Sequence, residues 1–243
     1  ILAGSAVHLA SLEVRQKAIK VAQQVLEVSE QDLILQNGRV EVLGVPGHGV
    51  SLATIARKLK GSPGYALPRG VTPGLEATSL FQFDAHAFAS ATHACEVEVD
   101  IGTGDVRTLR YVAVHDSGRL INPMIAEGQI HGGVVHGIGN ALFEKMRFDE
   151  IGQPLTTTFA DYLLPTATEI PNIEVLFHES PSPTNPLGVK GIGETGTIPV
   201  SACVISAVED ALGQFNVRIR EAPLSPVRIL EMIDEGRARS STA

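Results

Sequence analysis

The 243-residue chain has only two cysteines and no Cys-x-x-Cys pair. Such pairs commonly hold structural zinc or iron–sulfur clusters, so the chain itself is expected to supply neither kind of site. Cys95 alternates with polar residues in a strand-like segment, and Cys203 lies on the apolar face of a helical pattern. Both cysteines are therefore predicted to be core residues.

The sequence also has no apolar run near 18 residues and no charged-then-apolar leader. A membrane span and an export signal are therefore not expected, and the default prediction is a cytoplasmic protein. The formal net charge is −8, with both signs scattered along the chain, which argues against a nucleic-acid surface. An apolar content of 44% is ample for the core of one large domain or two small ones.

The most distinctive stretch covers residues 181–212 and reads PSPTNPLGVKGIGETGTIPVSACVISAVEDAL. A proline-rich lead-in is followed by a glycine-rich loop that holds one carboxylate, Glu194, between Gly193 and Gly196. After Pro199 apolar residues recur at helical spacing, which predicts a buried helix. A carboxylate presented by such a loop at the start of a rigid helix is well suited to act as a general base.

This loop allows two other interpretations. The letters GIGETG match the dinucleotide-binding pattern G-x-G-x-x-G, which requires a strand directly before the glycines and an acidic residue ending a second strand. A proline-rich loop separates residues 173–177 from Gly191, and the downstream acids Glu209 and Asp210 lie in the predicted helix. A nucleotide site is therefore disfavoured, whereas a glycine-rich turn with a solvent-facing glutamate stays open.

The remaining elements alternate between helical and strand patterns. A first helix, five turns long, is expected to begin at Gly4 and Ser5, with Ser5 as its N-cap. Such a helix start suits a phosphate, and an ordinary cap explains it equally well. The other expected elements are strands over 32–35 and 39–43 around Asn37-Gly38, a helix over 52–59, strands over 93–100 and 106–115, a helix from Pro123, paired segments 143–148 and 154–159, a strand over 173–177, a strand over 216–218 and a helix over 225–234.

These elements predict an α+β fold with mixed and antiparallel sheets packed against helices. Residues 1–60 form a helix-plus-hairpin part, the glycine- and proline-rich residues 61–74 a linker or loop, and residues 75–243 the remainder. The helix from Pro123 contains five glycines, each costing about 1 kcal/mol relative to alanine. Close backbone approach, to another helix or to a bulky ligand, would explain them.

No metal site built from protein side chains is predicted. His93 and His115 lie at strand positions without a second ligand nearby in sequence, which favours a structural role. His131 and His136 are five residues apart, so they project about 140° apart around a helix and do not form a pair on one face.

Several ordered segments resemble one protein family. PLGVKGIGETGTIPVSACVISAVEDAL resembles the C-terminal signature of the molybdenum-binding large subunit of the xanthine dehydrogenase and aldehyde oxidase superfamily, closest to its carbon monoxide dehydrogenase-like members. Residues 75–81, 88–123 and 127–165 resemble successive segments of that subunit, in the same order. The resemblance covers most of the chain and implies a molybdenum cofactor-binding domain.

The resemblance also implies an activity and a set of site residues. The activity is hydroxylation of an aldehyde, an N-heterocycle or a carbon monoxide-type substrate, with water as the oxygen source. Glu194 corresponds to the general base, and the protein contributes no side-chain ligand to the metal. A solvated lysine is the alternative for Lys190, and His136 stands where many members have a glutamine. The candidate cofactor-binding residues are Gln129, Gly4, Ser5, Lys190, Gly191 and Gly193.

The implied cofactor is molybdenum–molybdopterin in its cytosine dinucleotide form, with [2Fe-2S] and FAD on partner subunits. The implied partners are an upstream half of the large subunit, an iron–sulfur small subunit, a flavin medium subunit and a small-molecule substrate. Because that upstream half forms one wall of the cofactor pocket, the chain is expected to be a split subunit or a fragment that does not turn over alone. A catalytically silent assembly or interaction paralogue and a nucleotide-binding module are the alternatives.

Overall fold

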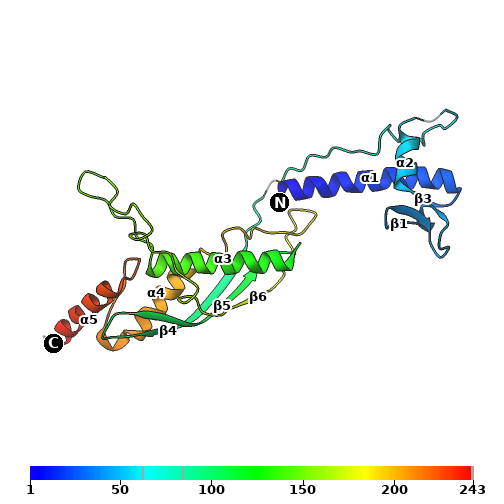
Figure 1. Cartoon of the computed structure of the whole chain (residues 1–243). Coiled ribbons are helices and arrows are strands. Elements are labelled where there is room, and N and C mark those ends of the chain that lie inside the picture. Colours follow the sequence, from blue (N-terminus) through cyan, green and yellow to red (C-terminus); the bar gives the residue numbers. More distant parts are fainter. Residues whose placement is uncertain (62, 84, 242–243) are drawn as a thin grey trace. The chain divides into compact units, whose positions relative to one another are not determined.

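The computed structural model describes residues 1–61, 63–83 and 85–241, and the chain forms two compact units (Figure 1). Unit 1 comprises Ile1–Ala85 and Asn185–Leu187, and unit 2 comprises His86–Thr184 and Gly188–Ala243. The described part of 61–74 has neither helix nor strand and lies within unit 1, because the division falls between residues 85 and 86. Among the described residues, no helix is long and apolar enough to cross a membrane.

Unit 1 combines two helices with a small antiparallel sheet. Its elements are α1 (Leu2–Leu26), a short 3₁₀ helix η1 (Glu30–Asp32), the neighbouring strands β1 (Leu33–Gln36), β2 (Arg39–Val42) and β3 (Gly49–Ser51), and α2 (Leu52–Leu59). The predicted hairpin is confirmed, since Asn37 and Gly38 have the positive φ angles, 47° and 73°, that a primed turn requires. The core of unit 1 consists of Ala18, Ile19, Val21, Ala22, Leu33, Val40, Val50, Ile55 and Leu59.

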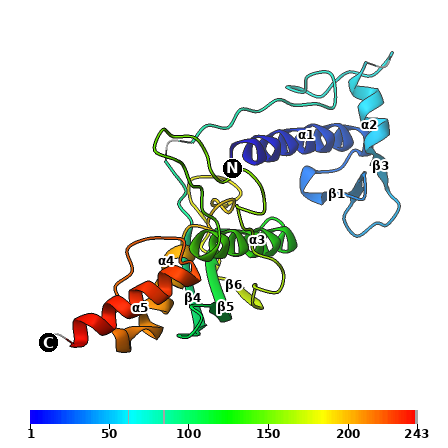
Figure 2. The ribbon, with the colours of Figure 1, turned by 60° about the vertical axis from the view of Figure 1, so that its left-hand side comes forward.

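Unit 2 is built on a mixed three-stranded sheet, so the α+β prediction is confirmed. β4 (Ser90–Val99) pairs antiparallel with β5 (Val106–Asp116), which pairs parallel with β6 (Ile173–Phe177). Helix α4 (Val200–Ala211) packs on β4, and α3 (Pro123–Leu142) packs on α4 and β6 (Figure 2). A 3₁₀ helix, η2 (Gly213–Phe215), and α5 (Pro226–Ser241) complete the unit.

The glycines of α3 have two different surroundings. A Cβ added to Gly133 would lie 2.8 Å from the backbone of Gly196, and one added to Gly137 would overlap Val200. These two glycines allow α3 to approach the start of α4 closely. At Gly128 and Gly132, by contrast, an added Cβ would meet nothing within 4 Å. Packing within this chain therefore explains only part of the glycine content of the helix.

Of three predictions in the C-terminal half, one was confirmed in part and two were wrong. Segments 143–148 and 154–159 do pair across the turn, through the bridge Phe148–Pro154 and the bond from Leu155 N–H to the Arg147 carbonyl, but the pairing is too short to form strands. Residues 216–218 form no strand, since Asn216 has a positive φ of 54° and turns the chain after η2. The last helix is longer than 225–234 and continues through residue 241.

Three polar side chains from β4 and β5 meet on one face of the sheet. His93 Nδ1 lies 2.9 Å from the hydroxyl of Tyr111, and His93 Nε2 lies 2.8 Å from His115 Nε2. Tyr111 and His115 are fully or almost fully buried. Cys95 and Cys203 are half-buried and pack against the same core. The two histidines therefore have partners that their sequence neighbours did not reveal.

We expect this histidine pair to make unit 2 sensitive to acid. Burial, and then the neighbouring His115, lowers the pKa of His93 to about 4, and burial lowers the pKa of His115. An unfolded histidine titrates near ~6.5, so the folded form binds fewer protons, and stability is full above this pH and is lost as the pH falls toward about 4. The lowered pKa of His93 corresponds to at most about 3 kcal/mol, and solvent screening of this half-buried side chain reduces the expected loss to roughly 2 kcal/mol.

Urea unfolding measured between pH 7 and pH 4 checks this expectation. The variant His93→Gln should show a shallower fall in unfolding free energy than the wild type over this range. The exposed His178 lies in the same unit, so His178→Gln is the matched control and should keep the wild-type slope. Parallel curves for wild type and His93→Gln would contradict the assignment.

Candidate functional site

The glycine-rich loop begins next to a contact between two segments that are distant in sequence, residues 117–118 and 189–190. Gly118 and Val189 form an antiparallel bridge, and Lys190 N–H donates to the Ser117 carbonyl at 2.9 Å. Gly118 has a φ of 67°, and an added Cβ would lie 2.9 Å from the Lys190 nitrogen, so a larger residue would not fit here. We call residues 191–199 the Glu194 loop. Its start is held in place by the contacts at the end of β5.

A buried ion pair strengthens the same attachment. Lys190 Nζ lies 2.6 Å from Asp116 Oδ2, and the two side chains are only 14% and 16% exposed. Asp116 Oδ1 also accepts hydrogen bonds from the backbone N–H groups of Gly118 and Ser180. Desolvation raises the pKa of Asp116, but the bonds from Lys190, Gly118 and Ser180 outweigh it and hold this pKa below its usual value.

The interpretation of Lys190 as a solvated lysine is therefore wrong, because its ammonium group is paired and largely buried. Its predicted contact with a cofactor is not tested by this geometry. Asp116 was not among the predicted site residues. A carboxylate followed two residues later by glycine at the end of a strand indicates a turn, but Lys190 lies 74 residues further along the chain.

Glu194 is presented by a series of turns that ends in α4. The backbone carbonyl of Glu194 accepts hydrogen bonds from Thr197 N–H and Ile198 N–H, at 2.9 and 3.3 Å. Glu194 itself is exposed. Gly196 lies buried against Ile130 of α3, where an added Cβ would be 3.0 Å from the Ile130 backbone. The loop is therefore fixed through its backbone, which leaves the carboxylate exposed to solvent.

The structure brings Gln129 and the Glu194 loop together. Gln129, on α3, donates from Nε2 to the carbonyl of Gly193 at 2.5 Å, across 64 residues of sequence. Its amide oxygen accepts no bond from the described residues, and the residue is exposed. Gly191 and Gly193 are exposed as well. Four of the predicted site residues, Gln129, Gly191, Gly193 and Glu194, thus lie within one small region of unit 2.

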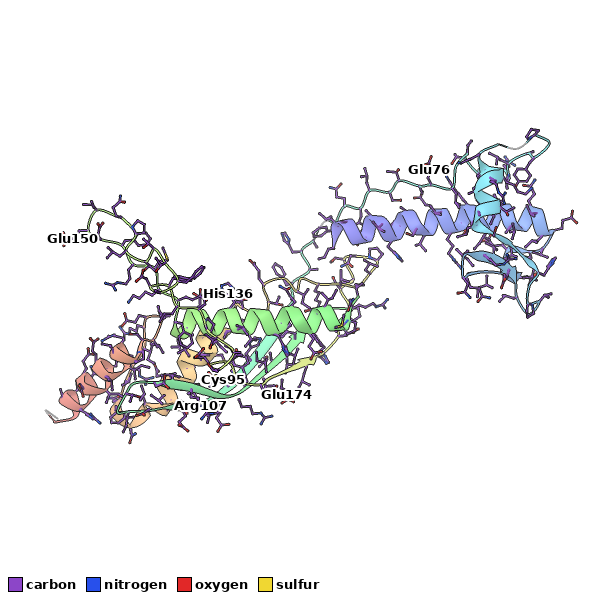
Figure 3. The ribbon with its side chains drawn as sticks, viewed as in Figure 1. Glu76, Cys95, Arg107, His136, Glu150 and Glu174 are labelled. Carbon is purple, nitrogen blue, oxygen red and sulfur yellow. The ribbon has the colours of Figure 1, made fainter. Side chains whose placement is uncertain are left out.

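A strip of uncovered helix backbone continues from this region. Gly128 and Gly132 are exposed and four residues apart, so they share one face of α3 next to Gln129. His136, labelled in Figure 3, is exposed one turn further along the helix. A face without side chains, bordered by an amide and a carboxylate, leaves room for a large flat polar group. These residues therefore fit a cofactor of the pterin type.

Gly4 and Ser5 lie in unit 1 and differ from expectation. Helix α1 begins at Leu2, and Ser5 N–H already donates to the Ile1 carbonyl at 2.9 Å, so the prediction of Ser5 as N-cap is wrong. Ser5 is instead fully buried, and its hydroxyl has no partner among the described residues. Gly4 is exposed, with Leu187 3.3 Å from where its Cβ would be. Their contact with a cofactor stays a prediction.

Comparison with known proteins agrees with this fold and identifies the family. Residues 1–171 match the family described as the molybdopterin cofactor-binding domain, and the chain belongs to this family. It is 40% identical to the nicotine 6-hydroxylase large subunit of Paenarthrobacter nicotinovorans over 230 residues, which are 95% of the chain and 28% of that protein. It is 36% identical to the carbon monoxide dehydrogenase large chain of Hydrogenophaga pseudoflava, covering 96% of the chain and 29% of the relative.

Solved structures give the same result. The carbon monoxide dehydrogenase from Oligotropha carboxidovorans matches with a TM-score of 0.84 at 33% identity, covering 97% of the chain and 29% of the neighbour. The quinoline 2-oxidoreductase from Pseudomonas putida 86 matches with a TM-score of 0.82 at 39% identity, covering 91% and 28%. The chain is thus a molybdopterin-binding domain of the molybdenum hydroxylase large-subunit type, and it spans less than a third of the length of these relatives.

Proposed function

We propose that the chain is the C-terminal cofactor-binding part of a molybdenum hydroxylase large subunit, in which Glu194 is the general base. The observation that carries the proposal is the bond from Gln129 to Gly193, because it sets the bare face of α3 beside an exposed carboxylate. The names of the relatives support an oxidoreductase. Two of them act on N-heterocycles, nicotine and quinoline, so this is the substrate class we favour over aldehydes and carbon monoxide.

In this proposal each residue has a separate task. The bound molybdenum–molybdopterin group supplies the two-electron oxidation and the oxygen that derives from water. Glu194 accepts a proton at a carboxylate oxygen during hydroxylation. Gln129, with its amide nitrogen held by Gly193, keeps its oxygen free to accept a hydrogen bond from a pterin N–H. Gly191 and Gly193, which have no side chains, allow the group to approach the loop backbone.

The Asp116–Lys190 ion pair fixes the residue directly before the Glu194 loop. The base can therefore keep its position while substrate binds and product leaves. We propose that Gly4 and Ser5 serve the dinucleotide part of the cofactor, in its cytosine form, through the Gly4 N–H in the first turn of α1 and the Ser5 hydroxyl, which has no partner among the described residues. The remaining walls of the pocket, a [2Fe-2S] subunit and an FAD subunit would come from partners.

A bulky side chain at Gly132 should prevent cofactor binding without harming the fold. A Cβ at this position meets nothing within 4 Å, and leucine favours helix more than glycine by about 1 kcal/mol. In the assembled enzyme, Gly132→Leu is expected to fold normally and to lose most of its molybdenum, measured by metal and pterin quantitation.

The matched control is Gly213→Leu, because Gly213 also has open space around its Cβ position but lies in η2. This variant should keep wild-type molybdenum. Full molybdenum in both variants would contradict the placement of the cofactor on α3. A wild-type complex that contains no molybdenum at all would instead favour the silent paralogue.

A further inference from the structure

Cys95 and Cys203 are 108 residues apart in sequence but meet between β4 and α4. Their sulfur atoms lie 3.5 Å apart, and the Cys95 thiol also lies 3.5 Å from the Cys203 carbonyl, to which it donates. Both thiols are free and half-buried (Cys95 is labelled in Figure 3). The pair is therefore close enough to react together after a small movement, and both residues are partly exposed to solvent.

The surroundings make the two thiols unequal. The neighbouring Cys95 and, against the effect of burial, the neighbouring Tyr111 lower the pKa of Cys203 to about 7. The neighbouring Cys203, together with burial, raises the pKa of Cys95. Tyr111 is itself fully buried and is held from its other side by His93 at 2.9 Å. Cys203 is thus the more ionised and more nucleophilic partner near neutral pH.

We infer that Cys95 and Cys203 form a thiol pair that a peroxide oxidises reversibly to a disulfide between β4 and α4. The Cys203 thiolate attacks one peroxide oxygen, so that an S–O bond forms, the O–O bond breaks and hydroxide leaves. The Cys95 sulfur then displaces hydroxide from the Cys203 sulfenic acid, forming the S–S bond. The two thiols lose two electrons and two protons, and hydrogen peroxide is reduced to two waters.

The position of the pair gives the bond a structural consequence. Helix α4 begins at Val200, directly after the Glu194 loop, and Cys203 lies on its first turn. A disulfide would attach this turn covalently to the central part of β4. The inference that the two thiols join rests on their sulfur geometry, and the order of attack also uses the lowered pKa of Cys203. Neither depends on Glu194 being a base.

The test uses the full protein, treated at pH 7 with graded hydrogen peroxide and then alkylated and digested without reductant. Mass spectrometry should find a peptide pair joined through Cys95 and Cys203, two hydrogens lighter than the reduced pair and separated by dithiothreitol. In untreated protein, Cys203 should react with iodoacetamide at least ~10-fold faster than Cys95 at pH 7.

Single substitutions separate the two steps. Cys95→Ser should allow peroxide to form a sulfenic acid on Cys203 that dimedone captures, whereas Cys203→Ser should leave Cys95 largely unmodified. Urea-unfolded protein is the control and should give the joined peptide less readily than native protein. The inference fails if native protein gives no joined peptide, if Cys203 proceeds to sulfinic acid beside an intact Cys95 thiol, or if unfolding makes no difference to the yield.

Discussion

Replacing Glu194 with glutamine in the assembled enzyme is expected to lower kcat by at least ~10²-fold, the low end of what a positioned general base contributes. Molybdenum content and folding should stay near wild type, because Glu194 is held through its backbone carbonyl and its side chain is exposed. Since a base acts in the transition state, kcat/KM should fall together with kcat. Steady-state kinetics with metal quantitation provides the measurement.

Glu150 offers a matched control for this experiment. It is an exposed glutamate in the turn over residues 149–152, away from α3 (Figure 3), so Glu150→Gln removes the same charge elsewhere in unit 2. This variant should retain wild-type turnover. If Glu194→Gln also retains it with full metal, the glycine-rich loop is the turn with a solvent-facing glutamate that the sequence left open.

The second large effect concerns the cofactor. The chain alone is expected to retain no stoichiometric molybdenum, whereas the assembled protein with its remaining walls and partner subunits should contain it. The physical reason is exposure, because Gln129, Gly132 and Glu194 all lie on an open surface and ligand sites bury most of the surface of what they bind. Metal analysis of both preparations checks this.

The control for the metal analysis is a preparation in which the chain is shown to be folded. A cooperative unfolding transition in the isolated chain would exclude loss of metal through misfolding. Stoichiometric molybdenum in a folded, isolated chain would contradict the claim that the pocket needs further walls.

Local patterns predicted most elements of the fold. Asn37-Gly38 identified a hairpin because a primed turn requires positive φ, and the helices α2 and α4 start where the apolar spacing changes. The pairing of β6 with β5 could not be predicted, since a strand pattern does not reveal its neighbour. The strand predicted over 216–218 is absent for a different reason. The left-handed backbone of Asn216 turns the chain there, although the local residue pattern suits a strand.

The candidate site divides in the same way. Glu194 was found because its signals, glycines and a following helix, are contiguous in sequence. Asp116 and the contact of Gln129 with Gly193 were missed, since each joins segments 64 or more residues apart. The histidine pair could not be found from the hairpin turn alone, because a bulge between Glu96 and Val97 shifts the register by one residue. This shift sets His93 opposite Ala113, so that Tyr111 and His115 lie diagonally to it on the same face.

The central claim is that Glu194 acts as a base beside a molybdenum cofactor held by this chain. Single-turnover reduction of the molybdenum centre by substrate tests it most directly, because this measurement isolates the chemical step from product release and electron transfer to partners. With wild type and Glu194→Gln at equal molybdenum occupancy, we expect the variant to be reduced at least ~10²-fold more slowly. Reduction of the variant at the wild-type rate would contradict the account.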